Sequence, residues 1–157
     1  MNSLLAIEAD IGTPIVILQA NCDGRFFFNF NIGGSVSHIV QITTEVRDEA
    51  AVQAACQRLH LPRATRGTFE LYSSTETGLG IELPHWKYPV VANTETGQLR
   101  YDNYGGRWGS QEFLDQLLQS YCVEKSKIEA RKAGHSIFEQ KLDDGSIKLT
   151  INVGGIA

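Results

Sequence analysis

The feature that most limits the fold is a long helical pattern in the C-terminal third of the chain. After Ser110, apolar residues recur at helical spacing: Phe113, Leu114, Leu117, Leu118, Tyr121, Cys122 and Ile128. Ser110 is a typical N-cap residue, and Gly134 suits the left-handed position that follows a helix. The pattern predicts one helix from Ser110 to about Ala133, with an apolar stripe that other elements must cover.

The segment before this helix predicts strands and one shorter helix. Residues 38–46 alternate between apolar and polar side chains, as in a strand with one buried side. Asp48 is an N-cap for a helix that ends before Pro62. Four short strand-like runs follow between residues 68 and 102, the last two joined by a turn at NTETG.

The last segment predicts a hairpin, and with it the fold class. Asp144 and Gly145 separate two β-prone runs, which is typical of a type I′ turn. The expected order of elements is β-α-β-β-β-β-α-β-β. This order predicts a single α+β domain, with an antiparallel or mixed sheet and both helices on one face.

The N-terminal residues 1–35 stand apart from this pattern. They are apolar and weakly patterned. The codons of Gly33-Gly34 can contain a ribosome-binding sequence, and the valine codon GTG, at Val36, can start translation in bacteria. One interpretation makes residues 1–35 an N-terminal extension, a leader from an over-extended gene. The other makes them a loose hairpin, because Asp23-Gly24 lies between the β-prone runs IVILQ and RFFFNFNI. In both, residues 36–157 form the α+β domain.

Composition narrows the class of protein. Hydrophobic residues make up 42% of the 157 residues and charged residues 20%, which is ordinary for a globular domain. The formal net charge of −4 argues against sequence-independent nucleic-acid binding, which needs a basic surface. No apolar run is long enough to cross a membrane, and the N-terminus lacks a secretory signal pattern. Three widely spaced cysteines form no disulfide or zinc pattern, so we expect a cytoplasmic protein.

Several short motifs from Ser37 onward resemble one protein family. They are SHI, WG at Trp108-Gly109, EFLDQLLQSY, EARKAGHSIFEQ and DGSIKLTI. On these motifs, residues 37–157 resemble domain of unknown function family 1257, the chloroplast "ycf thirty-five" group, as a divergent bacterial member. In that family SH follows the initiator Met directly. The resemblance therefore implies that Val36, which precedes Ser37-His38, is the first residue. The resemblance implies a domain of this extent and no catalytic residue.

The residue patterns point to no catalytic group, cofactor or metal. The four histidines, His38, His60, His85 and His135, lie in different predicted elements without a metal-binding spacing. Nucleophile motifs such as GxSxG are missing, and GGRWG lacks the length and the lysine of a phosphate-binding loop.

The stretch RYDNYGGRWGSQEF, residues 100–113, holds the candidate site. Its glycines and Asn103 are explained by a connection between a strand and the long helix, but Arg107 and Trp108 are not. Five of the seven Trp and Tyr residues lie between residues 86 and 108: Trp86, Tyr88, Tyr101, Tyr104 and Trp108. Aromatic residues and arginine are enriched in protein interfaces. Four residues therefore form the candidate ligand- or partner-binding set: Arg107, Trp108, Tyr104 and Trp86.

These residues predict a binding or accessory module with a protein partner. A first alternative is an anion-binding domain or enzyme near Arg107, at the N-terminus of the long helix, with His85 and Asp102 converging on it. A second alternative is a nucleic-acid-associated protein that uses Arg58, Arg63 and Arg66.

Overall fold

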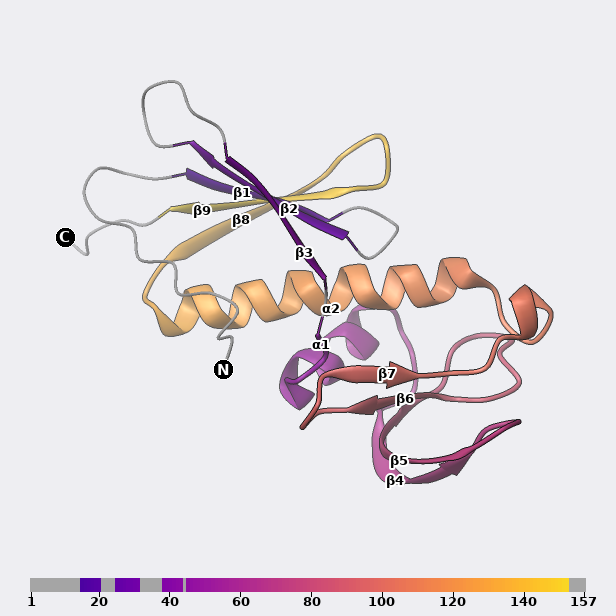
Figure 1. Cartoon of the computed structure of the whole chain (residues 1–157). Helices are drawn as coiled ribbons and strands as arrows, with labels where there is room; N and C mark the ends of the chain where they lie inside the picture. The colour runs from indigo at the N-terminus through magenta and orange to yellow at the C-terminus, as the bar shows by residue number, and fades with distance from the viewer. Residues whose placement is uncertain (1–14, 21–24, 32–37, 44, 153–157) are drawn as a thin grey trace.

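Two sheets and two helices make up the part of the chain that the computed structural model describes, residues 15–20, 25–31, 38–43 and 45–152 (Figure 1). In chain order these elements are β1 (Ile15–Ala20), β2 (Arg25–Asn31), β3 (His38–Thr43), α1 (Glu49–Arg58), β4 (Thr65–Glu70), β5 (Thr75–Ile81), β6 (Val90–Asn93), β7 (Gln98–Arg100), α2 (Gln111–Lys132), β8 (Ser136–Lys141) and β9 (Ile147–Asn152). The α+β class and the element order from β3 onward are confirmed.

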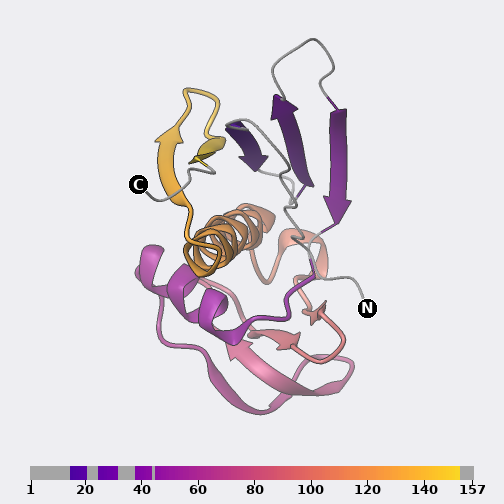
Figure 2. The same cartoon turned by 90° about the vertical axis from the view of Figure 1, so that its left-hand side faces the viewer.

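The strands form two sheets and not the single sheet that the sequence predicted. One sheet has the order β3-β2-β1-β9-β8 and the other the order β4-β5-β6-β7, and the neighbouring strands in both are antiparallel. Helix α2 lies between the two sheets, with α1 and the four-stranded sheet on one side and the five-stranded sheet on the other (Figures 1 and 2). Both helices thus pack on one face of the four-stranded sheet, as expected, and α2 carries a second sheet on its back.

Helix α2 supports two sheets because it is buried on two opposite faces. The expected apolar stripe supplies Leu114, Leu117 and Tyr121 to a core shared with α1, β5 and β6. About half a turn away around the helix lie five further buried residues, which are mostly small or polar: Gln119, Ser120, Val123, Ser126 and Ala130. Small side chains let the five-stranded sheet approach the helix axis, and β9 meets this face with buried Ile147, Leu149 and Ile151.

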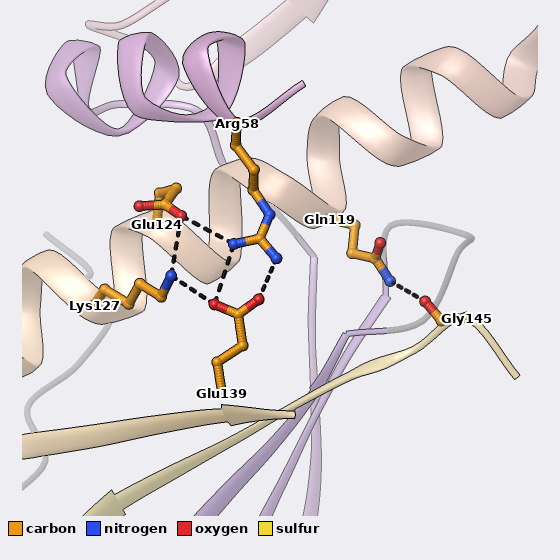
Figure 3. Close-up of polar contacts among 6 residues, drawn as sticks. All are labelled: Arg58, Gln119, Glu124, Lys127, Glu139 and Gly145. Carbon is orange, nitrogen blue, oxygen red and sulfur yellow. Dashed lines mark hydrogen bonds and ion pairs between the residues drawn. The ribbon is translucent and has the colours of Figure 1, made fainter. Parts of the chain in front are cut away.

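A cluster of four charges fastens the layers to one another. The guanidinium of Arg58 in α1 pairs with Glu139 of β8 and with Glu124 of α2, the latter at 3.2 Å (Figure 3). Lys127 of α2 lies 2.5 Å from Glu139 and 3.3 Å from Glu124. All four side chains are mostly shielded from solvent, so the cluster joins α1, α2 and β8 at one point.

The loop of the β8–β9 hairpin is also fixed to α2. The side-chain amide of Gln119 donates a hydrogen bond to the backbone carbonyl of Gly145 at 3.0 Å (Figure 3). Gly145 has a left-handed φ of 83°, but Asp144 is not among the residues with positive φ. The turn is therefore not type I′. The amide of Gly145 donates to the carbonyl of Leu142, and the Leu142 amide to the carbonyl of Ser146, which makes a longer three-residue loop with glycine in its left-handed position.

The N-terminal strands β1 and β2 pair with each other in antiparallel fashion, as in the hairpin interpretation, and the Asp23-Gly24 turn expected between them lies outside the described residues. Strand β1 also pairs with β9, with Leu18 opposite Leu149. It therefore lies between β2 and β9 in the five-stranded sheet. Residues 1–14 and 32–37 lie outside the described residues, and the proposed start at Val36 is among them. That residues 1–35 are a leader stays a prediction.

Candidate binding surface around Trp108

The connection between β7 and α2 is a compact loop that presents two aromatic side chains. The carboxylate of Asp102 accepts a hydrogen bond from the Tyr104 amide at 3.3 Å, and the Trp108 amide donates to the carbonyl of Asn103 at 3.0 Å. A short 3-10 turn covers Tyr104–Gly106, whose three residues have left-handed φ values of 44°, 60° and 93°. Glycine tolerates this conformation, while tyrosine is strained in it, and the two hydrogen bonds above hold the loop backbone in this shape.

Trp108 is the centre of a cluster of aromatic rings from three separate segments. Its ring stacks on Tyr104, with centroids 4.6 Å apart and an interplanar angle of 23°. Tyr72, from the turn between β4 and β5, lies 4.9 Å away, and Tyr88, from the segment before β6, lies 5.6 Å away edge-on. Offset and edge-to-face pairs at these distances are favourable, so the rings hold one another in place.

Two cations lie over the rings of this cluster. The ammonium of Lys87 is 4.7 Å from the Trp108 ring centroid and 5.4 Å from that of Tyr88. The guanidinium of Arg107 is 5.4 Å from the centroid of Tyr104. Both positions fall within the range of cation–π attraction. We call the six residues Tyr72, Lys87, Tyr88, Tyr104, Arg107 and Trp108 the Trp108 surface.

The Trp108 surface remains open to solvent although its rings contact each other. Tyr72 is 68% exposed and Tyr104 is 54% exposed, which makes them two of the four large hydrophobic side chains that are exposed in the described part of the chain. A third, Tyr101, lies next to the same loop, and the fourth, Phe138, lies on β8. Exposed apolar area is therefore gathered in one place rather than scattered.

Trp86 supports this surface from behind. Its indole N–H donates a hydrogen bond to the carbonyl of Ser110 at 3.1 Å, and its ring packs edge-on against Tyr101 at 5.9 Å. The ring also fills the space where a side chain at Gly109 would lie, which explains why that position is glycine. The amide of Lys87 donates to the carbonyl of Trp108 at 2.8 Å, so the segment after Trp86 is fastened to the loop.

A pocket of about 380 Å³ opens beside the Trp108 surface and shares Lys87 and Tyr88 with it. The pocket lies between the outer face of β4–β5 and the segment Trp86–Pro89. Its walls include Arg63, Phe69 and Glu82 as well as Trp86. The ring of Phe69 lies against Gly80, where no side chain could stand without displacing it. This volume is in the range that accepts a few side chains or a small ligand.

The structure brings together three of the four predicted site residues, Arg107, Trp108 and Tyr104. The fourth, Trp86, is the neighbour that positions them. The sequence did not indicate Tyr72 or Lys87, because they lie 36 and 21 positions before Trp108 and reach it through the fold. The clustering of Trp and Tyr between residues 86 and 108 was the one sequence signal for the surface.

The arginines of the nucleic-acid alternative do not form one basic patch. Arg58 is paired with Glu124 and Glu139 between the layers. Arg66 is 2.6 Å from Glu49. Of the three, Arg63 lines the pocket and pairs with no carboxylate of the described residues. Two of the three charges are thus neutralised within the fold.

The residues of the enzyme alternative contact different parts of the chain. The Asp102 carboxylate caps the amide of Tyr104, and His85 lies 6.4 Å from Phe113, ring to ring. Neither they nor Arg107 line the pocket beside the surface. At the start of α2, the Ser110 hydroxyl accepts from the Glu112 amide at 3.3 Å, and the carboxylate of Glu112 lies in the first turn, where it complements the helix dipole.

Two further findings bear on the kind of site. Within the described residues, no three or more His, Cys, Asp or Glu side chains are grouped so that they could hold a metal ion. Neither α1 nor α2 has the length and apolarity that a helix needs to span a bilayer.

Comparisons with protein-family models, with curated proteins and with solved structures each found no match. The resemblance to domain of unknown function family 1257 therefore rests on the short motifs alone and stays a prediction.

Proposed function

We propose that the protein is a binding module, and that the Trp108 surface recognises a segment of a partner protein. The observation that carries the proposal is the packing of Trp108 among Tyr104, Tyr88 and Tyr72, with two of these tyrosine rings exposed by more than half. Tryptophan, tyrosine and arginine are the residues whose truncation most often weakens protein complexes, and here all three types lie on one surface.

The geometry favours binding because the rings are already fixed before a partner arrives. Trp108 is held by its backbone bond to Asn103 and by the Lys87 amide, and Tyr104 by its amide bond to Asp102 and by stacking on Trp108. A partner would meet an ordered surface, so less side-chain entropy would be lost on association. The surface combines apolar rings with two cations that lie over ring faces, and aromatic residues and arginine are enriched in protein interfaces.

The two alternatives have less support. A nucleic-acid surface needs several cations along one groove, and two of the three candidate arginines are paired with carboxylates of the same chain. An enzyme needs a nucleophile or an acid–base pair beside a cavity, and the pocket beside the surface has Glu82 as its only carboxylate among the described lining residues. We also propose a cytoplasmic location and membership of domain of unknown function family 1257. Neither of these assigns an activity.

The test is a selection of displayed random peptides on the folded protein. Peptides are selected on the wild type, and each enriched clone is measured against Trp108→Ala and, as a matched control, Phe138→Ala, because Phe138 is exposed to 64% on another face. The proposal expects clones that bind wild type and Phe138→Ala equally and lose binding to Trp108→Ala. Selection that yields no clone dependent on Trp108 would contradict it, provided that both variants keep the wild-type circular dichroism spectrum.

A further inference from the structure

We infer that the partner segment bound at the Trp108 surface is acidic: its carboxylates meet Lys87 and Arg107, and an apolar neighbour enters the pocket that Phe69 and Tyr88 line. The inference rests on the proposed function and adds the chemistry of the partner to it. It follows from the placement of three cations, Lys87, Arg107 and Arg63, that form no ion pair with the described residues.

The cations in the described part of the chain, residues 45–152, fall into two groups. Those that hold elements together are paired with carboxylates, as Arg58 is with Glu139 and Lys125 with Asp48 at 2.8 Å. Lys87, Arg107 and Arg63 have no such pair among the described residues, although the chain carries more acids than bases. These three cations lie around one aromatic surface and its pocket, and none has an ion pair in the described part of the chain that an incoming carboxylate would have to break.

The rings make these cations better anion partners than ordinary surface charges. The ammonium of Lys87 lies over Trp108 and Tyr88, and the guanidinium of Arg107 lies over Tyr104, so each is held on one side by a ring face. Their outward sides remain available to an incoming carboxylate. A charge that is already held in position loses little freedom when it forms a hydrogen bond, and charge-assisted bonds are among the strong ones.

The pocket adds a place for an apolar side chain next to that carboxylate. It shares Lys87 and Tyr88 with the Trp108 surface, so a single extended segment can contact both. Its walls include the rings of Phe69, Trp86 and Tyr88, and the Phe69 ring covers Gly80. Arg63 stands at the same pocket and favours a second acidic residue.

The nearby carboxylates set limits on this occupant. Asp102 is used as the cap of Tyr104, and Glu76 accepts a hydrogen bond from Ser74 at 2.9 Å. Glu82 lines the pocket and would repel a continuous phosphate backbone that ran through it. All three carboxylates keep their negative charge, so the region suits a peptide whose few acidic residues contact the cations one by one better than a continuous chain of phosphates.

The inference is tested with two displayed peptide libraries that share the same randomised apolar positions. The first carries Asp or Glu at alternate positions and the second carries Lys or Arg there. Clones dependent on Trp108 are expected from the acidic library alone. If they come from the basic library, or equally from both, the inference is overturned while the proposed function stands. If neither library yields such a clone, both are overturned.

Single-residue variants then test the assigned contacts. The best acidic clone is made as a fluorescein-labelled peptide, and its dissociation constant is measured by fluorescence anisotropy. Lys87→Ala and Arg107→Ala should each weaken binding by about 10-fold or more, as expected on loss of a charge-assisted hydrogen bond. Lys141→Ala and Arg131→Ala remove cations that also have no ion pair in the described part of the chain but lie elsewhere, and they should leave binding unchanged. Equal binding by all four variants would overturn the inference.

Nucleic acid is tested in the same assay. A fluorescein-labelled single-stranded oligothymidylate should not bind the wild type at about 0.15 M salt, where exposed charges are well screened. Oligothymidylate binding that is lost in Trp108→Ala would overturn the inference, because the occupant of the surface would then be a nucleic acid.

Discussion

The hydroxyl of Tyr121 in α2 accepts a hydrogen bond from the backbone amide of Asp48, the N-cap of α1, at 3.2 Å. The same oxygen accepts from the amide of Arg47 at 3.1 Å. Tyr121 is buried, and burial raises the pKa of its phenol, so the hydroxyl stays neutral at physiological pH. One side chain of α2 thereby satisfies two amides at the start of α1 and sets how the helices pack.

Replacing this hydroxyl should destabilise the domain. Tyr121→Phe keeps the ring in the core and leaves the amides of Arg47 and Asp48 without their acceptor, so we expect a loss of about 1–3 kcal/mol in the free energy of unfolding. Urea unfolding followed by circular dichroism measures it. Tyr72→Phe, at a ring that is 68% exposed, is the control and should change little. A Tyr121→Phe midpoint equal to that of the control would show that the two amides find another acceptor.

The charge cluster predicts a pH-dependent contribution to stability. The Arg58 guanidinium, followed by Lys127, lowers the pKa of Glu139 from 4.5 to about 2 against the opposing effect of burial. A carboxyl with a lowered pKa stabilises the fold fully above its unfolded pKa of 4.5, and this contribution is lost as the pH falls towards 2. Glu139→Gln should therefore lower stability at pH 7 by about 1–3 kcal/mol.

The difference between wild type and Glu139→Gln should then shrink as the pH is lowered through that window. Urea midpoints of both proteins at a series of pH values measure it. Glu70→Gln is the matched control, because Glu70 is exposed and has no ion pair among the described residues. A Glu139→Gln deficit that stays constant down to about pH 2 would exclude the ion pairs as its cause.

A side chain at Gly109 should disturb the support of the Trp108 surface. A Cβ atom there would overlap the ring of Trp86, so Gly109→Ala must displace that ring and break its hydrogen bond to Ser110. We expect a loss of about 1–3 kcal/mol. In a Trp108→Phe background, Trp86 is the single remaining tryptophan of the two, and its emission should shift to longer wavelength. Gly67→Ala, where the added Cβ would meet Phe69 at an ordinary 3.5 Å, should do neither.

The N-terminal strands give a further prediction. Removing residues 1–35 takes away β1 and β2, and β9 loses the strand that pairs with it from Ile147 to Asn152. Buried Leu149 and Ile151 would lie at a new sheet edge, so we expect a loss of more than about 2 kcal/mol in unfolding free energy. Thermal and urea unfolding of the full and shortened chains measure it. Equal stability would favour the interpretation of residues 1–35 as a leader.

The sequence predicted the elements well and the layers incompletely, for a reason seen in α2. Its apolar stripe at Leu114, Leu117 and Tyr121 is strong, and it led to one covered face. The opposite face is buried through Gln119, Ser120 and Ser126, which a hydrophobicity pattern reads as exposed. Such residues are buried because the Gln119 amide reaches the Gly145 carbonyl and the serines leave room for a sheet. That depends on the partner strand, which α2 alone does not specify.

The candidate site was predicted in part for a similar reason. Trp108, Tyr104 and Arg107 lie within five positions, so their proximity follows from the chain itself. Tyr72 reaches them from the β4–β5 turn and Lys87 from the segment before β6. The register of β4 with β5 and the bond between the Lys87 amide and the Trp108 carbonyl decide these contacts, and neither is visible as a local pattern.

The most direct test of the Trp108 surface as the binding site is ¹H–¹⁵N NMR. It follows the two indole N–H signals of the protein while a selected acidic peptide is added. The indole of Trp86 is bonded to the Ser110 carbonyl behind the surface, whereas Trp108 lies within it. The account predicts that the Trp108 signal shifts in a saturable way, and that the Trp86 signal shifts with it, because the Trp86 ring lines the pocket beside the surface. A Trp108 signal that stays unchanged at saturating peptide, or a shift of Trp86 alone, would contradict the claim that this surface binds the partner.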